Sequence, residues 1–164
     1  MDNMEFHTVR GYQLLDQNKR LLTSAMEDYL EMIFRNSSNG YLRINRLAEL
    51  LHVKPSSVTK MVQKLGSLGF LKYEKYGIIV LTENGTEIGK YLLERHNIIE
   101  SFFALINAGD HVLEETELIE HYLSPETMRN LHLFIQFLNK NPDIRQQFEN
   151  YKSYHNTNYN LSGR

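Results

Sequence analysis

Residues 44–82 carry the pattern that most restricts the folds open to this chain, INRLAELLHVKPSSVTKMVQKLGSLGFLKYEKYGIIVLT. Periodic apolar residues predict a short amphipathic helix over about 45–51 and a second helix over about 55–68. Pro55 fits the first turn of the second helix, where its missing N–H costs nothing. The aromatic and β-branched run over 70–81 surrounds a glycine and predicts a β-hairpin, the wing. This order is typical of a winged helix-turn-helix, which places one helix in the DNA major groove.

The second helix and the hairpin carry the side chains that we predict to contact DNA. Hydroxyl and basic groups bond phosphates, and amides also pair with base edges. Residues 41–75 hold seven Lys or Arg and two Glu, a local charge of +5. A structural helix pair with a solvated basic face is the alternative interpretation. The candidates are Pro55, Ser56, Ser57, Thr59, Lys60, Gln63 and Lys64 on the helix, and Lys72, Lys75 and Tyr76 on the hairpin.

The rest of the chain reads as helical, so the predicted fold class is mainly α, with a two-stranded wing and an all-α second part. Ser24, with Glu27 three residues on, predicts an N-cap with a capping box. Thr82 and Ser124 are further expected N-caps. Weak patterning predicts an N-terminal extension with a single helical turn and a flexible C-terminal end. The expected helices cover 24–35, 83–107, 113–123, 125–140 and 142–154, between an extension over 1–22 and a tail over 155–164.

Composition excludes several classes of protein. No run of about 18 apolar residues is present, so we expect no membrane span and no membrane partner. The N-terminus lacks the apolar segment of a secretory signal, which favours a cytoplasmic location. The chain has no Cys and therefore no disulfide or thiolate metal site. The net charge is −2, and five Glu with no Lys or Arg lie between residues 114 and 126.

Two groups of carboxylates have a spacing that suits a metal ion. Asp28 and Glu31 are three residues apart, so both lie on one face of the first expected helix. Glu117, Glu120 and His121 share a face of a later helix in the same way. Clustered carboxylates repel one another unless a cation lies nearby. Oxygen and imidazole ligands without sulfur favour a hard first-row ion such as Mn²⁺. Solvated helix faces are the alternative.

Four segments together resemble the diphtheria-toxin-repressor family, most closely its short manganese-transport-regulator branch. They are MEDYLEMIF (26–34), KPSSVTKMVQKLGSLGFLKYEKYGIIVLTENG (54–85), RHNIIESF (95–102) and ELIEHYLS (117–124). The likeness covers roughly residues 23–140 in unbroken order. It implies a metal-activated repressor with a winged-helix domain and a helical domain that dimerises and shares the metal site.

The resemblance also implies a ligand set and a metal. In the iron-sensing branch Met matches Asp28 and Cys matches Glu117, whereas this chain has oxygen ligands at both positions. The implied cofactor is therefore Mn²⁺, for which Fe²⁺, Co²⁺ or Zn²⁺ can substitute. The wing departs from the family pattern, with Gly77-Ile78 where Arg-Gly is commoner. The implied metal ligands are Asp28, Glu31, His96, Glu117, Glu120 and His121.

The functional hypothesis is a manganese-responsive repressor that binds double-stranded operator DNA as a homodimer and controls metal-uptake genes. The corresponding domains are 23–91 for DNA binding and 92–154 for metal binding and dimerisation. One alternative is a metal-independent winged-helix regulator that responds to a small organic ligand. The other is a metal hydrolase, against which no separate base, nucleophile or phosphate loop is found. We therefore expect no enzymatic activity.

Overall fold

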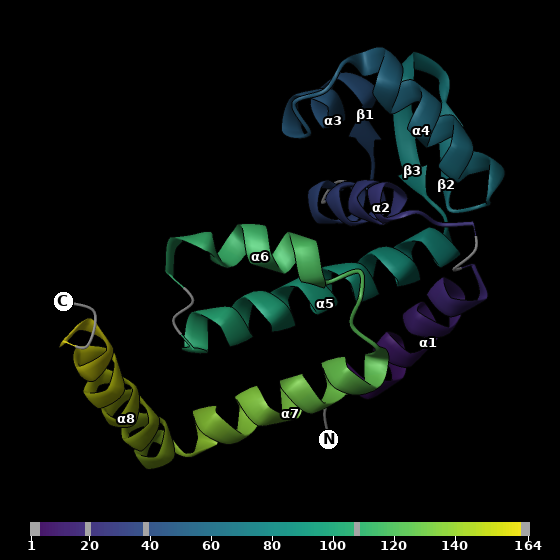
Figure 1. Cartoon of the computed structure of the whole chain (residues 1–164). Helices are drawn as coiled ribbons and strands as arrows, with labels where there is room; N and C mark the ends of the chain where they lie inside the picture. The colour runs from purple at the N-terminus through teal and green to yellow at the C-terminus, as the bar shows by residue number, and fades with distance from the viewer. Residues whose placement is uncertain (1–3, 19–20, 38–39, 107–108, 162–164) are drawn as a thin grey trace. The chain divides into compact units, whose positions relative to one another are not determined.

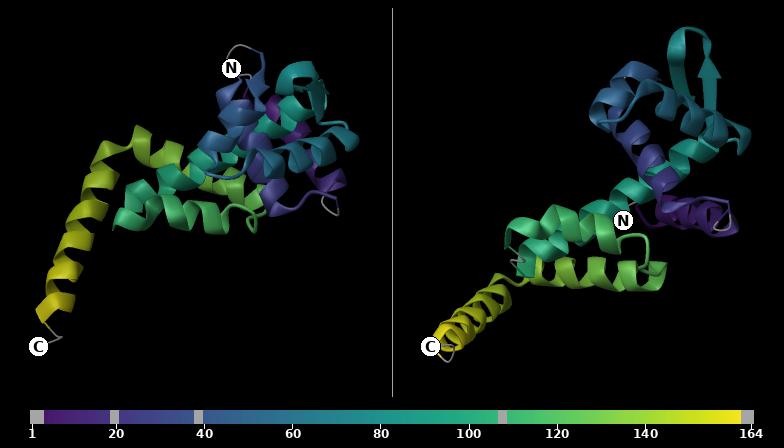
Figure 2. Two further views of the ribbon diagram at one scale, coloured as in Figure 1. Left: turned by 90° about the horizontal axis from the view of Figure 1, so that it is seen from above. Right: turned by 45° about the horizontal axis from the view of Figure 1, so that its top comes forward.

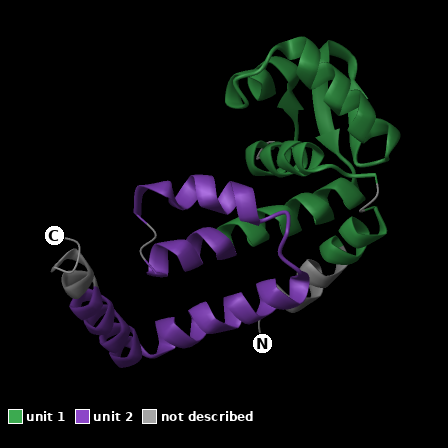
Figure 3. Cartoon of the chain, viewed as in Figure 1, with its two compact units in different colours: residues 1–97 green, residues 98–164 purple. Residues whose placement is uncertain are grey.

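A computed structural model describes residues 4–18, 21–37, 40–106 and 109–161, with side chains described only between residues 11 and 155. The chain divides into two compact units, residues 1–97 and residues 98–164 (Figure 3). One long helix, α5 (Glu83–Ile106), begins in the first unit and ends in the second. None of the described helices is long and apolar enough to cross a membrane.

Unit 1 contains the predicted winged helix-turn-helix (Figure 1). Its strands pair antiparallel in the order β1-β3-β2, so the hairpin gains a third strand that the sequence analysis did not predict. Leu42 of that extra strand pairs with Ile79 of the hairpin. The elements are α2 (Ser24–Asn36), β1 (Leu42–Arg43), α3 (Ile44–Leu50), α4 (Pro55–Ser67), β2 (Leu71–Glu74) and β3 (Ile78–Leu81), with a 3₁₀ turn at Lys75–Gly77.

One apolar core joins the elements of unit 1. It contains the inward stripes of α2, α4 and the first half of α5, together with the buried face of the sheet. Each fully buried Leu, Ile or Val side chain contributes about 1.5–3 kcal/mol relative to exposure. The described residues without solvent exposure include Leu30, Ile33, Val58, Val62, Leu65, Ile79, Ile88 and Leu92.

Helices α3 and α4 end in the same backbone motif, although different residues occupy its left-handed position. After α4, Gly69 has φ +83°, and the N–H of Phe70 donates to the carbonyl of Leu65 over 3.1 Å. After α3, the N–H of Val53 donates to the carbonyl of Ala48 over 3.0 Å. The left-handed residue there is His52, with φ 53°. This motif normally uses glycine, because a Cβ is strained at positive φ.

The helix starts agree with the predicted caps except at one position. Thr82 accepts a hydrogen bond from the N–H of Gly85 at the start of α5, over 3.1 Å. Ser124 accepts one from the N–H of Thr127, over 3.2 Å. The prediction of Ser24 as N-cap was wrong: Ser24 is already helical and Thr23 is the capping residue. The backbone of Thr23 is extended, as an N-cap requires.

Unit 2 is helical in its described part, with two differences from prediction. The helix expected over 113–123 is α6 (Val112–Ile119), so His121 lies in the turn after the helix and not on its face. The helix α7 (Pro125–Lys140) has the predicted bounds. The last helix, α8 (Pro142–Leu161), continues past residue 154, so residues 155–161 are helical and not a flexible tail. The final part of that predicted tail lies outside the described residues.

The N-terminal extension also differs from prediction, since α1 (Met4–Gln17) is a helix of 14 residues and not a single turn. It lies alongside the first half of α5 in unit 1 (Figures 1 and 2). Among the described side chains of α1, Leu15 is buried.

We predict that His52→Gly stabilises the protein. Glycine removes the strain at φ 53° but increases the freedom of the unfolded chain, so the net gain in the free energy of unfolding is about 0.5–1 kcal/mol. Urea denaturation measures it. Gly69→Ala is the matched control with the opposite sign, because its Cβ meets nothing within 4 Å and only the backbone strain changes. A destabilised His52→Gly variant would contradict the strain at this turn.

Candidate functional site

The outer face of α4 is polar, basic and free of acidic residues. Its inward stripe of Val58, Val62 and Leu65 is fully buried, which fixes the opposite face toward solvent. Thr59 is only half-buried, and its hydroxyl donates to the carbonyl of Pro55 over 2.9 Å. The other predicted helix contacts are exposed: Pro55, Ser56, Ser57, Lys60, Gln63 and Lys64.

The wing presents basic and aromatic side chains at its tip. Lys72 and Lys75 are exposed, and Tyr76 is 86% exposed. Tyr76 has φ 63° and is followed by Gly77 with φ 72°, so two successive left-handed residues turn the hairpin. A large aromatic ring in this conformation is uncommon. The strained turn holds the Tyr76 ring away from the core of unit 1.

A hollow of about 330 Å³ lies between the start of α4, the strand β1 and the wing. Its lining combines hydroxyl, amide and phenol groups with one guanidinium, that of Arg43. Arg43 and Asn45 were not among the predicted DNA contacts. The sequence signal for Arg43 was its place in the basic run over 41–75, and its exposure on the short strand β1 is seen only in the structure. The lining residues are Arg43, Ile44, Asn45, Pro55, Ser56, Thr59, Tyr73, Tyr76 and Gly77.

In unit 1 the fold brings two of the predicted metal ligands together. Glu31 on α2 and His96 on α5 are 8% and 5% exposed. The imidazole Nδ1 lies 4.0 Å from Oε1 of the carboxylate, which is too far for a hydrogen bond between them. Arg35 also donates to this carboxylate from the next turn of α2. Asp28, one turn before Glu31, is exposed.

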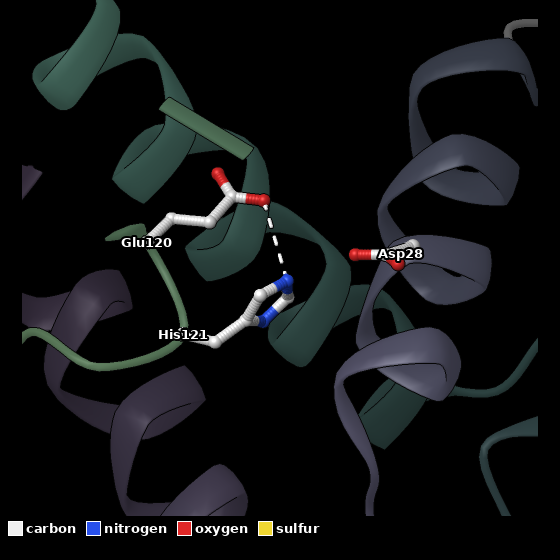
Figure 4. A group of neighbouring side chains, drawn as sticks. All are labelled: Asp28, Glu120 and His121. Atoms are coloured by element: carbon white, nitrogen blue, oxygen red, sulfur yellow. Dashed lines mark ion pairs between the residues drawn. The ribbon is translucent and has the colours of Figure 1, made fainter. Parts of the chain in front are cut away.

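In unit 2 two further predicted ligands lie next to each other. Glu120 follows the last residue of α6 and is 2% exposed, and its Oε1 lies 3.8 Å from Nε2 of His121 (Figure 4). Figure 4 also draws Asp28 on its own helix, α2. Glu117 is exposed on α6. The end of α6 therefore holds an imidazole and a carboxylate together, and Glu117 is one turn away on the solvent side.

The donor set suits a divalent first-row metal. Each unit supplies one buried carboxylate and one imidazole, and the chain has no sulfur of cysteine to offer. Buried carboxylates are stabilised by positive charge, which Arg35 supplies at Glu31 and which a bound cation would increase. Oxygen and nitrogen donors without thiolate fit Mn²⁺ or Fe²⁺ better than soft ions. The residues present thus fit the metal that the sequence analysis implied.

Comparison with known families assigns both parts of the chain. Residues 21–79 match the family described as iron dependent repressor, N-terminal DNA binding domain. Residues 82–149 match the iron dependent repressor, metal binding and dimerisation domain. Helix α1 precedes both matches.

Curated relatives agree over most of their length. The HTH-type transcriptional regulator MntR of Lysinibacillus sphaericus is 42% identical over 136 residues, which is 82% of this chain and 98% of that protein. The regulator of the same name from Listeria welshimeri is 45% identical over 123 residues, 74% of this chain and 87% of that protein.

Solved structures share the fold. The manganese regulator SloR has a TM-score of 0.60 and 28% identity, over 68% of this chain and 54% of that chain. The IdeR protein of T. acidophilum has a TM-score of 0.56 and 27% identity, over 64% of this chain and 51% of that chain. This chain therefore spans about half the length of these solved relatives.

We predict that Arg43→Ala weakens DNA binding without changing sequence preference. We expect the guanidinium in the hollow beside the start of α4 to contact phosphate, so its loss reduces the slope of log affinity against log salt by about one unit per subunit. Fluorescence anisotropy at several salt concentrations measures the slope. Arg145→Ala, at an exposed arginine of α8, makes the same change in net charge and serves as the control. Equal slopes for the two variants would contradict a phosphate contact at Arg43.

Proposed function

The chain belongs to the diphtheria-toxin-repressor family, in its branch of manganese regulators, and on this premise we propose how its own residues bind metal and DNA. It is a manganese-responsive transcriptional repressor and not an enzyme. The first matched domain serves DNA binding, and the second serves metal binding and homodimerisation.

Six side chains form the proposed metal site. The observation that carries the proposal is the pair Glu31 and His96, a buried carboxylate and imidazole that α2 and α5 hold 4.0 Å apart within unit 1. Glu120 and His121 offer a second buried carboxylate with an imidazole in unit 2. The full proposed set is Asp28, Glu31, His96, Glu117, Glu120 and His121.

The ligand residues come from both units of the chain. When bound, Mn²⁺ supplies the positive charge that offsets the carboxylates of this set. Without that charge, Asp28 and Glu31 on α2 repel each other, as do Glu117 and Glu120 at the end of α6. We propose that offsetting this repulsion lowers the ordering cost of DNA binding.

The reading surface in the proposal is α4 with the wing. We propose that exposed Ser56, Gln63 and Lys64 read base edges and phosphates and that exposed Lys72, Lys75 and Tyr76 contact the DNA backbone. Arg43 adds a further phosphate contact from the hollow. In a homodimer, two copies of α4 meet half-sites about one helical turn apart.

Unit 2 exposes apolar side chains of the kind that a dimer interface covers. On α7, Leu133, Phe134 and Phe137 are 54%, 46% and 48% exposed. Leu118 on α6 is 72% exposed, and Tyr122 just after it is 86% exposed. Exposed apolar surface of this kind marks association sites. It supports homodimerisation through unit 2.

The finer assignments are part of the proposal. We propose residues 23–91 as the DNA-binding domain, residues 92–154 as the metal-binding and dimerisation domain, and flanking segments 1–22 and 155–164. The protein is proposed to act in the cytoplasm on operator DNA of metal-uptake genes. The two other hypotheses differ in kind: a small-ligand regulator would bind DNA without metal, and a hydrolase would turn over substrate.

A DNA-binding titration tests the proposed function. The probe is a duplex selected from random sequences with the full-length protein and Mn²⁺, at one fixed salt concentration. We expect Mn²⁺ to tighten binding about 10- to 100-fold over chelator, with Fe²⁺ and Zn²⁺ compared in parallel. Affinity that is equal with Mn²⁺ and with chelator would overturn the metal-responsive mechanism and favour the small-ligand alternative.

Replacing Asp28 with Met tests the ligand set itself. A thioether in place of the carboxylate removes a hard donor, so we expect the metal response to broaden or shift from Mn²⁺ toward Fe²⁺. DNA binding is titrated with each metal under anaerobic conditions. Asp143→Met, at an exposed carboxylate of α8, is the control and keeps the original response. Full manganese selectivity in Asp28→Met would show that the hard-ligand assignment is wrong.

A further inference from the structure

Helix α1 precedes the residues that match the family, yet it is built into the core of unit 1. Leu15 is 8% exposed and belongs to the same apolar cluster as the inward residues of α2 and α4. Tyr12 and Leu14 pack against that cluster and are partly buried. The extension is therefore a structural part of the DNA-binding unit.

Helix α1 approaches α5 at a glycine. A Cβ built on Gly11 would lie 2.6 Å from the backbone oxygen of Glu87 and 2.6 Å from Cβ of Tyr91. Real Cβ atoms do not occur at such distances, and a helix backbone cannot yield as a flexible side chain can. Glycine in a helix costs about 1 kcal/mol relative to alanine. The close approach to α5 offsets that cost.

Tyr91, which α1 contacts, lies one turn before an ion pair between α5 and α2. The rings of Tyr12 and Tyr91 have centroids 6.0 Å apart and are tilted by 54°. Tyr91 is 4% exposed, and burial raises the pKa of its phenol to about 12, so it stays neutral. One turn further along α5, Nη2 of Arg95 donates to Oε2 of Glu27 on α2 over 2.9 Å.

This ion pair lies beside proposed metal ligands on both helices. The side chains of Arg95 and Glu27 are 4% and 14% exposed, so their attraction is little screened by water. Glu27 immediately precedes Asp28 in α2, and Arg95 immediately precedes His96 in α5. Helix α1 contacts α5 at Tyr91, one turn before Arg95, so it acts on the part of α5 that places His96 opposite α2.

We propose that α1 is a positioning element of the metal site: by packing Gly11 and Tyr12 against Glu87 and Tyr91, it holds α5 against α2 and sets the affinity for Mn²⁺. The inference rests on the proposed function, because it assumes that Glu31 and His96 bind the metal. Holding two ligand-bearing helices in place before binding lowers the ordering cost and tightens binding. A helix that only covers apolar surface would affect stability and leave metal affinity unchanged.

Gly11→Ala in the full-length protein separates these two roles. Alanine favours an isolated helix, but its Cβ cannot fit against the α5 backbone, so α1 is displaced. We expect amides of residues 4–17 to exchange hydrogen faster in the metal-free protein and the affinity for Mn²⁺ to fall about 3- to 10-fold. Calorimetry measures the affinity, and electron paramagnetic resonance of bound Mn²⁺ reports a wider spread of ligand geometries. Both are measured well below the melting temperature.

Gln13→Ala is the matched control, since Gln13 is exposed on the other side of α1. It leaves exchange and metal affinity at wild-type values. Tyr12→Ala provides a second variant that loses the ring contact without a backbone clash, and it weakens Mn²⁺ binding in the same direction.

The possible outcomes distinguish a failure of the positioning role from a failure of the proposed function. If Gly11→Ala or Tyr12→Ala displaces α1, as exchange reports, while Mn²⁺ affinity stays at the wild-type value, the positioning role is overturned. The positioning role is also overturned if neither variant displaces α1, because the contact then does not hold the helix. A wild-type protein that binds no Mn²⁺ overturns the proposed function itself.

Discussion

The packing of α2 against the first half of α5 is the contact on which unit 1 depends. Leu30 and Ile33 of α2 and Ile88 and Leu92 of α5 belong to one cluster without solvent exposure. At about 1.5–3 kcal/mol each, such residues offset part of the cost of burying polar groups nearby. The same two helices carry the Arg95–Glu27 ion pair and the Glu31–His96 pair. The apolar contact thus supports polar groups that would be unfavourable in isolation.

The parts of the fold that the sequence predicted are those that local signals determine. Pro55, Thr82 and Ser124 lie at helix starts because their side chains act on the next turn of backbone. The features that were missed depend on contacts between distant residues. Strand β1 is two residues long and exists because Leu42 and Arg43 pair with β3. Helix α1 was underestimated because its contact at Gly11 involves α5, more than seventy residues later.

In the candidate metal site too, local spacing predicted some ligands and could not predict others. Helical spacing placed Asp28 near Glu31, and it grouped Glu117, Glu120 and His121, but the helix α6 ends before the last two. No spacing could place His96, which is 65 positions from Glu31, beside that carboxylate. Only the family resemblance included His96 in the ligand set, and the pairing of α2 with α5 then gives it a buried carboxylate neighbour.

The location of the proposed ligands limits what metal can change. Helices α3 and α4 and the wing contain none of the six proposed ligand residues, and their shape follows from the unit 1 core, the sheet and the turns at His52 and Gly69. The proposed reading face of one subunit therefore contains no proposed metal ligand. DNA affinity in a homodimer also depends on whether two reading faces match the half-site spacing at once. On the proposed ligand set, metal acts on that match and not on the reading face itself, which makes the positions of α2 and α5, and of the α1 helix packed against α5, part of the proposed switch.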